Sequence, residues 1–237
     1  MKKFIGAALA VGATMAGAAS AHAEVSGNVA IVSDYVFRGV SLSDNGPAIQ
    51  GGFDWNNDQF YAGTWASSLS EGVEIDLYAG WTPTTGPVSW DLGAIMYNYP
   101  GANDAGAEFD YYELKAAGTY NFSDALHAGA ALYYSPENYG KTGDATYWEV
   151  NGEYDVSETL HFTAAYGNQE VEHPGGGSTP RDNYNTWNLG ATVAMHGFEF
   201  DLRYNDTDID AGSSIESYTY GPSSYDSSFV LSIKRSL

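Results

Sequence analysis

The chain has 237 residues, of which 30 are acidic and 9 are basic, giving a formal net charge of -21, and it contains no cysteine. The acidity argues against nucleic-acid binding, and the lack of cysteine excludes disulfides, cysteine-ligated zinc and thiol nucleophiles. Charged residues make up only 16% of the chain and hydrophobic residues 43%, so it is too apolar for a disordered acidic protein and must bury or cover a large apolar surface.

The first 23 residues have the pattern of a secretory signal peptide. A short basic start precedes an apolar run over residues 4–19, and Ala21-His22-Ala23 supplies the small residues of a cleavage site. We therefore expect export, cleavage before Glu24, and a single domain over residues 24–237. The alternative, an N-terminal membrane anchor, is disfavoured because the run is short and rich in Gly and Ala.

Apolar and polar residues alternate along most of the remaining chain. In residues 73–81, for example, apolar side chains occupy every odd position, while Glu74 and Asp76 lie on the other face. This period of two predicts strands with two unlike faces. The predicted strands are 25–38, 47–55, 59–67, 73–81, 88–99, 109–120, 126–135, 146–154, 159–167, 184–193, 198–206 and 227–237. Most have the ~9–11 residues of a tilted membrane-spanning strand.

The connections between these segments alternate in length. Short turns at 56–58, 82–87, 121–125, 155–158 and 194–197 alternate with connections that are mostly longer, such as 168–183 and 207–226. This asymmetry is typical of an outer-membrane barrel. We predict an all-β fold, a single antiparallel up-and-down transmembrane β-barrel of about 12 strands, with short periplasmic turns and longer extracellular loops. Counts of 10 or 14 stay open, because some short turns merge easily.

Aromatic side chains gather at the predicted strand ends. The assignment puts all six tryptophans on the outward face, including Trp65, with Tyr61 and Phe37 also outward. Two such belts are typical of the headgroup levels of a membrane. A soluble barrel of the lipocalin type would instead turn its apolar face inward, and the acidic inward positions make that alternative costly, because buried unpaired carboxylates are expensive.

The N-terminal third resembles a known family. Residues 26–54 contain Ser26-Gly27-Asn28 and Asp34-Tyr35-Val36-Phe37-Arg38-Gly39, and the pattern continues in 60–67 and 75–80. These stretches are similar to the N-terminal signature of the TorF family of porins, and the similarity becomes generic after residue 81. The resemblance implies a Gram-negative outer-membrane barrel assigned to transport, without a well-defined substrate. It supplies no catalytic or ligand-binding residue.

The inward face is predominantly acidic. Ten acids against four basic residues, the last being Lys234, leave a formal lumen charge of -6, which predicts a cation-preferring channel. The alternative is that the carboxylates pair with the basic residues and plug the lumen, Glu113 with Lys115 and Asp201 with Arg203 above all. The lumen-lining candidates are Asp34, Arg38, Asp54, Glu74, Asp76, Asp91, Glu113, Lys115, Glu149, Glu153, Glu199, Asp201 and Arg203.

Two other classes of function were weighed against a channel. A barrel hydrolase needs an oriented histidine, yet nothing in the sequence places a serine or acid partner beside the inward His127 or His161. A structural or ligand-binding barrel would work through its loops, where the acids of 206–210 either attract Ca²⁺ weakly or are simply solvated. The tract 218–228 either folds into the pore or stays exposed.

The sequence therefore predicts a non-enzymatic, porin-like channel for passive diffusion of small solutes or ions. We expect no cofactor, no metal and no nucleic acid. The expected partners are outer-membrane lipid and lipopolysaccharide, the barrel-assembly machinery, and the small solutes or cations that pass through.

Overall fold

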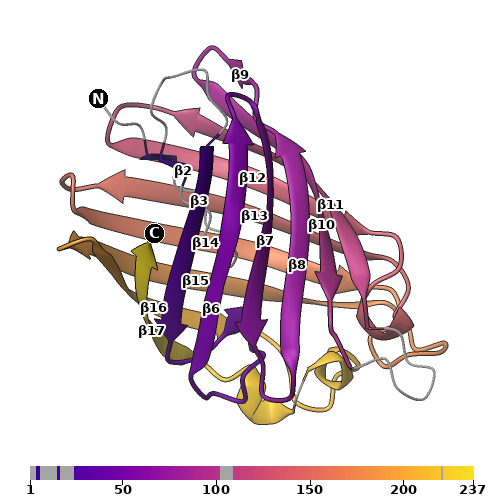
Figure 1. Ribbon diagram of the computed structural model, residues 1–237. Helices are drawn as coiled ribbons and strands as arrows, with labels where there is room; N and C mark the ends of the chain where they lie inside the picture. Colours follow the sequence, from indigo (N-terminus) through magenta and orange to yellow (C-terminus); the bar gives the residue numbers. More distant parts are fainter. Residues whose placement is uncertain (1–3, 6–14, 17–23, 102–108, 220) are drawn as a thin grey trace.

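The computed structural model describes residues 4–5, 15–16, 24–101, 109–219 and 221–237. Twelve strands form one antiparallel sheet that closes on itself when the last strand pairs with the first, for example Ile233 with Ile31 (Figure 1). This confirms the prediction of an all-β, up-and-down antiparallel barrel. The wall strands are β3 (Glu24–Val32), β6 (Ala48–Asn57), β7 (Phe60–Ser68), β8 (Val73–Trp81), β10 (Val88–Asn98), β11 (Tyr111–Asn121), β12 (Leu126–Ser135), β13 (Ala145–Asp155), β14 (Leu160–Val171), β15 (Asp182–Met195), β16 (Phe198–Thr207) and β17 (Ser228–Ser236).

Short accessory elements lie outside this wall. Two-residue strands β1 (Phe4–Ile5) and β2 (Met15–Ala16) pair with each other, β9 (Thr84–Thr85) extends the turn before β10, and β4 (Val36–Phe37) pairs with β5 (Val40–Ser41). The long loops carry three 3-10 turns, η2 (Tyr139–Lys141), η3 (Ile215–Tyr218) and η4 (Pro222–Ser224). Apart from β1 and β2, the predicted signal peptide lies outside the described residues. Among those residues, no helix is long and apolar enough to cross a membrane.

The two ends of the barrel differ. At one end, which we call the short-turn end, β6 meets β7 through residues 58–59 and β15 meets β16 through residues 196–197. At the opposite, long-loop end, the connections include 33–47, 136–144, 172–181 and 208–227. The asymmetry has the form expected from the sequence, and it places all three 3-10 turns at the same end.

Large apolar side chains cover the outside of the wall. Exposed examples are Ile49, Leu114, Leu189 and Phe229, each from a different strand. Their neighbours along each strand face inward, so the period of two separates an apolar exterior from a polar interior. The barrel thus shows the reverse of a soluble protein, whose apolar side chains would fill the inside.

Strand β7 faces the opposite way from the prediction. Trp65 is only 4% exposed and packs against the Tyr35 ring at 5.4 Å, and the Tyr61 hydroxyl donates to Asp91 Oδ1 at 2.7 Å. Both side chains therefore lie inside the barrel. The strand was placed one residue out of phase, and such a shift exchanges the two faces of the whole strand.

Strand β3 is shorter than predicted. It ends at Val32, and residues 33–47 form a loop in which β4 and β5 make a small hairpin. The Phe37 ring packs against Tyr97 at 6.0 Å, so it lies in the interior and not in an outward aromatic belt. The predicted wall positions Asp34 and Arg38 likewise belong to this loop.

Candidate functional site

The loop 33–47, which we call the inner loop, folds into the barrel at the long-loop end. Asp34 Oδ1 accepts hydrogen bonds from the hydroxyls of Ser41 and Ser43, at 2.6 and 2.9 Å, and these bonds hold the hairpin together. The Tyr35 hydroxyl donates to Glu74 Oε1 of β8 at 2.6 Å. The loop is therefore bonded to itself and to the wall, and it occupies space that a plain barrel would leave to solvent.

Arg38 connects the tip of the inner loop to the far wall. Its guanidinium makes a two-pronged ion pair with Glu113 of β11, with both N–O distances 2.7 Å, and also donates to Gln169 Oε1 of β14 at 2.8 Å. The side chains of Arg38 and Glu113 are 9% and 2% exposed. The charge also lies over the Tyr147 ring, 4.3 Å from its centre.

The backbone at this tip depends on glycine. Arg38 has φ 49° and Gly39 has φ 84°, in the left-handed region that side chains other than glycine adopt only at a cost. A Cβ atom on Gly39 would collide with the side chains of Thr207 and Thr186. The Arg-Gly pair therefore sets the sharp turn that aims the guanidinium into the barrel.

Tyrosine rings surround the Arg38–Glu113 pair. Tyr97 and Tyr111 stack at 4.5 Å between ring centres, and the Tyr97 hydroxyl donates to Glu113 Oε2 at 3.1 Å. Tyr133 and Tyr147 complete one buried cluster with them. The aromatic rings and the inner loop thus form a constriction across the interior, which we define as residues 33–47 together with Tyr97, Tyr111, Tyr133, Tyr147 and Glu113.

Among the described residues, one buried carboxylate beside the constriction has no hydrogen-bond partner, and one within it has a single unpaired oxygen. Asp76 is fully buried, and neither of its oxygens has a hydrogen-bond partner among the described residues; the same holds for Asp34 Oδ2. Glu74, two residues from Asp76 on the same face of β8, is also buried. Buried negative charge without a partner is costly, so a carboxyl at this position favours the uptake of a proton or a cation.

The four basic residues counted for the lumen all pair with acids. Arg38 binds Glu113, Lys115 binds Asp91 at 2.5 Å, Arg203 binds Asp201 at 3.1 Å, and Lys234 lies 3.7 Å from Glu199. The expected pairing of Asp201 with Arg203 is present. The expected partner of Glu113 was Lys115, and this was wrong, because Glu113 pairs with Arg38 of the inner loop and Lys115 pairs with Asp91.

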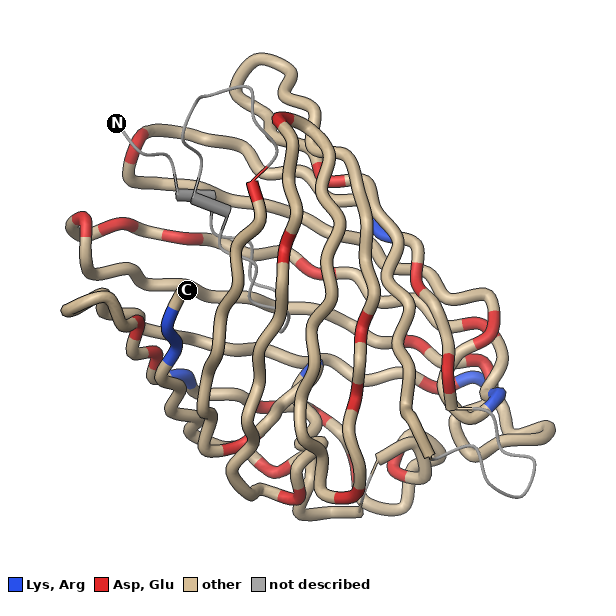
Figure 2. Tube along the Cα trace, in the orientation of Figure 1, with Lys and Arg blue, Asp and Glu red and all other residues tan. Residues whose placement is uncertain are grey.

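The remaining predicted lumen residues lie on the inner face of the wall strands. Asp54 accepts a hydrogen bond from the Tyr78 hydroxyl at 2.5 Å, and Glu149 accepts one from the Tyr147 hydroxyl at 2.9 Å. Glu153 lies nearer the short-turn end. Figure 2 shows acidic residues distributed along many strands, with few basic ones among them.

The structure corrects one expectation about the histidines. Asp155 lies beside both: its Oδ1 is 2.5 Å from His161 Nδ1, and its Oδ2 is 3.7 Å from His127 Nε2. The sequence placed Asp155 in a turn, whereas it is the last residue of β13 and pairs directly with His161 of β14. The sequence does contain a signal for this position: Asp155 comes two residues after the inward Glu153, so continued alternation would also place Asp155 inward.

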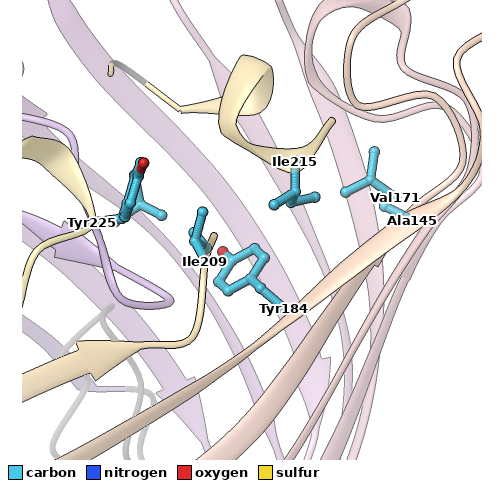
Figure 3. Close-up of a cluster of buried hydrophobic side chains, with 7 residues drawn as sticks. Ala145, Val171, Tyr184, Ile209, Ile215 and Tyr225 are labelled. Carbon is cyan, nitrogen blue, oxygen red and sulfur yellow. The ribbon is translucent and has the colours of Figure 1, made fainter. Parts of the chain in front are cut away.

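The last long loop covers the long-loop end. Ile215 of η3 packs with Val171 and Tyr184, as Figure 3 shows, and Ile209 and Tyr225 belong to the same buried cluster. The tract 218–228 therefore contributes Tyr225 to this buried cluster at the long-loop end. The acids nearby are engaged, since Asp208 accepts two hydrogen bonds from Asn185 at 2.6 Å each.

An ion pair joins two other long loops on the surface. Arg181 donates to Asp144 at 2.8 and 3.1 Å and to Glu170 at 2.9 Å. These hydrogen bonds hold the pKa of the Asp144 carboxyl below its usual range and raise the pKa of the guanidinium. The pair stabilises the packing of loop 172–181 on loop 136–144.

Comparison with known proteins gives a family and an architecture. A family model described as "Bacterial protein of unknown function (Gcw_chp)" matches residues 15–237. No curated protein sequence matches the chain. The TorF family named by the sequence resemblance is not the one matched, so membership of it stays a prediction.

Two solved porins have a similar fold. The NanC porin superimposes with a TM-score of 0.56 at 8% identity, covering 89% of this chain and 98% of that one. The KdgM porin, solved in complex with disordered oligogalacturonate, gives the same score and identity and covers 90% and 99%. At this identity the likeness shows the fold alone, and the fold is that of a porin.

Proposed function

The chain belongs to the Gcw_chp family of bacterial proteins, whose function is unknown, and we propose that its barrel is an outer-membrane channel for passive diffusion of small solutes or ions, with a preference for cations. The observation that carries this proposal is a closed barrel with an apolar exterior and an interior lined by ionisable groups. A barrel of this kind satisfies every wall hydrogen bond within the sheet, which is what crossing a lipid bilayer requires. The porin-like fold supports a channel in preference to an enzyme.

The proposed orientation puts the long loops outside the cell and the short turns in the periplasm. Outer-membrane lipid would cover the exposed band of apolar side chains, with lipopolysaccharide around the long-loop end. Assembly would then depend on the barrel-assembly machinery, after export directed by the predicted signal peptide.

The preference for cations follows from the unequal count of charges. Once the four basic residues are paired, the inward acids that no lysine or arginine neutralises are Asp34, Asp54, Glu74, Asp76, Glu149 and Glu153, together with the newly located Asp155. Fixed charge of one sign in a low-dielectric tube concentrates counter-ions. Oligogalacturonate, the ligand in the KdgM complex, is a polyanion, and this acidic interior would repel such a solute.

The reversal potential across a planar bilayer tests the proposal. The full chain, refolded in detergent, is inserted with a KCl gradient, and we expect stable conductance steps whose reversal potential favours K⁺. A Glu74→Gln and Asp76→Asn double variant removes two carboxylates beside the constriction and should lower the cation-to-anion permeability ratio severalfold. A double variant of exposed acids outside the constriction, Glu71→Gln and Asp124→Asn, should leave the ratio unchanged.

Two results would count against the proposal. A reversal potential that favours Cl⁻ would reject the preference for cations. A folded barrel that conducts nothing would reject the channel and favour the alternative function, a binding barrel that works through its loops. That alternative has one observation in its support, a pocket between three long loops lined in part by Tyr139, Pro174 and Tyr218.

A hydrolase is disfavoured by the surroundings of the histidines. Within the described part of the chain, the side chains hydrogen-bonded to the rings of His127 and His161 are Asn121 and Asp155. Neither supplies the hydroxyl nucleophile that acyl-transfer chemistry needs.

A further inference from the structure

Four side chains able to bind a metal ion meet at the short-turn end of the interior. His127 of β12 is the direct cross-strand partner of Glu153 on β13, and Asp155 of β13 is the partner of His161 on β14. Directly paired residues project side by side from the same face of a sheet. The three adjacent strands therefore bring two imidazoles and two carboxylates together inside the barrel.

The distances between these groups are short. Ligand atoms of Glu153, Asp155 and His161 all lie within 4.8 Å of one another. Asp155 bridges the histidines, with Oδ1 at 2.5 Å from His161 Nδ1 and Oδ2 at 3.7 Å from His127 Nε2. The side chains of His127, Asp155 and His161 are 15%, 20% and 18% exposed, so an ion in the lumen can reach them while most of the surrounding water is excluded.

A hydrogen bond to Asn121 orients the His127 ring. His127 Nδ1 lies 2.8 Å from Asn121 Oδ1, the acceptor at the end of the neighbouring strand β11. An imidazole whose Nδ1–H donates to such an acceptor keeps the lone pair of Nε2 for a metal ion. That Nε2 atom is the one turned toward Asp155.

The electrostatics also favour a cation. Glu153 and Asp155 are two residues apart on one face of β13, and two neighbouring carboxylates repel each other. The basic residues that neutralise other inward acids are engaged with Asp91, Glu113, Asp201 and Glu199. Among the described residues, the possible cations within salt-bridge distance of Asp155 are the imidazoles of His127 and His161, so a metal ion would add positive charge where the protein supplies little.

We propose that His127, Glu153, Asp155 and His161 form a binding site for a divalent transition-metal ion of the Zn²⁺ class. Zinc takes nitrogen and carboxylate oxygen at ~2.0–2.2 Å, so the ligand atoms of a tetrahedral site lie about 3.3–3.6 Å apart, and side-chain rotations would bring the cluster to that spacing. Imidazole suits zinc, copper and nickel, whereas calcium and magnesium select oxygen ligands. The site is independent of whether the barrel conducts.

Equilibrium dialysis of the full chain, refolded in detergent and stripped of metal, tests the site. The protein is dialysed against micromolar Zn²⁺ in the presence of millimolar Mg²⁺, which occupies the many surface carboxylates. We expect one tightly bound Zn²⁺ per wild-type chain, and near-complete loss of it in Asp155→Asn and His161→Ala. Co²⁺ bound in place of Zn²⁺ should give the visible absorption of a low-symmetry nitrogen and oxygen site.

The matched control is His173→Ala. His173 is also a histidine beside a carboxylate, with Nε2 3.8 Å from Glu172 Oε1, but it lies in a long loop away from the cluster. This variant should bind Zn²⁺ as the wild type does. Folding of each variant is checked by heat-modifiable electrophoretic migration, and Glu153→Gln, a near-isosteric change, takes the place of any variant that fails this check.

Two results would overturn the site. One is a wild-type chain that holds no Zn²⁺ against Mg²⁺, which would mean that the cluster is an ordinary histidine–aspartate ion pair. The other is an equal loss of Zn²⁺ in His173→Ala and His161→Ala, which would place the metal on the loops.

Discussion

At the scale of single residues, Arg38 does most to shape the interior. Arg38 has a left-handed backbone conformation. Its guanidinium lies over the Tyr147 ring and forms an ion pair with Glu113, whose side chain is 2% exposed. Because both charges are buried away from water, each is compensated mainly by the other. The contacts that fix the inner loop in the barrel include this charged pair, the Arg38–Gln169 hydrogen bond and the Tyr35–Glu74 hydrogen bond.

Arg38→Ala should therefore destabilise the folded barrel strongly. Removal of the guanidinium leaves Glu113 as an uncompensated buried charge, which costs about 3–5 kcal/mol in other proteins. Adding Glu113→Gln to Arg38→Ala should recover much of that loss, because the orphaned charge disappears. Urea unfolding in detergent, followed by tryptophan fluorescence, measures both.

Arg181→Ala is the matched control for this prediction. It removes an ion-paired arginine that is 38% exposed, where such pairs contribute about 0–1 kcal/mol. An Arg38→Ala loss no larger than the Arg181→Ala loss would show that the inner loop is not held by its buried pair.

Residue-scale prediction from the sequence was good for the direction in which several side chains of the wall strands point. The inward positions of Glu74, Asp76 and Glu113 follow from alternation alone, and their burial agrees with it. The partner of Glu113 did not follow, because Arg38 is 75 residues away and reaches it only by way of a folded loop. Asp155 was missed because a strand end and a turn look alike in sequence.

At the scale of elements, wall strands were predictable and inserted segments were not. Strand β8 runs from Val73 to Trp81, as the alternation and its flanking turns indicated. Strand β3 stops six residues early, although the apolar alternation continues to Phe37. Asp34 and its serine partners offer the backbone local hydrogen bonds that compete with the sheet. A period of two fits a wall strand and a small interior hairpin equally well.

Strand β7 shows a second limit of the pattern. Its outward positions hold Phe60, Ala62, Thr64 and Ala66, and its inward positions hold Tyr61 and Trp65. Assigning the larger aromatic residues to the lipid face gave the wrong phase. The interior needs these rings, since Tyr61 binds Asp91 and Trp65 packs on the inner loop.

The loop pair 136–144 and 172–181 should loosen in acid. The pKa of Asp144 is depressed by its hydrogen bonds from Arg181, so the carboxylate stabilises the folded pair above the ordinary aspartate pKa of ~3.9. That stability is lost as the pH falls through the depressed value. The loops should therefore stay packed at neutral pH and separate only in strong acid.

Hydrogen exchange of the Glu172 and His173 amides measures this effect, because both donate to carbonyls of loop 136–144, Asp144 and Thr142. Comparison of the wild type with Arg181→Ala at each pH cancels the intrinsic effect of pH on exchange. We expect protection in the wild type to exceed that in the variant at pH 7, and the difference to vanish in strong acid. An equal difference at every pH would contradict the role of Asp144.

At the scale of the whole molecule, the barrel consists of a closed wall and a packed interior. Its wall is a continuous sheet whose closure by β3 and β17 leaves no free edge. Its packed interior lies at the long-loop end, where the inner loop, the tyrosines and the last loop meet. Composition and alternation predicted the wall and its acidic lining. The filling of the interior arises from contacts between distant segments, which local patterns do not record.

The central claim is that this barrel is a channel and that the inner loop sets its width. It is tested most directly by single-channel conductance of a variant in which residues 33–47 are replaced by a two-residue Asn-Gly turn, which suits the tight hairpin left by the pairing of Val32 with Ala48. A variant with residues 175–177 removed from a surface loop serves as the control. The account predicts larger, cation-selective steps for the first variant and wild-type steps for the control. Folded barrels that conduct nothing, with or without the inner loop, would contradict it.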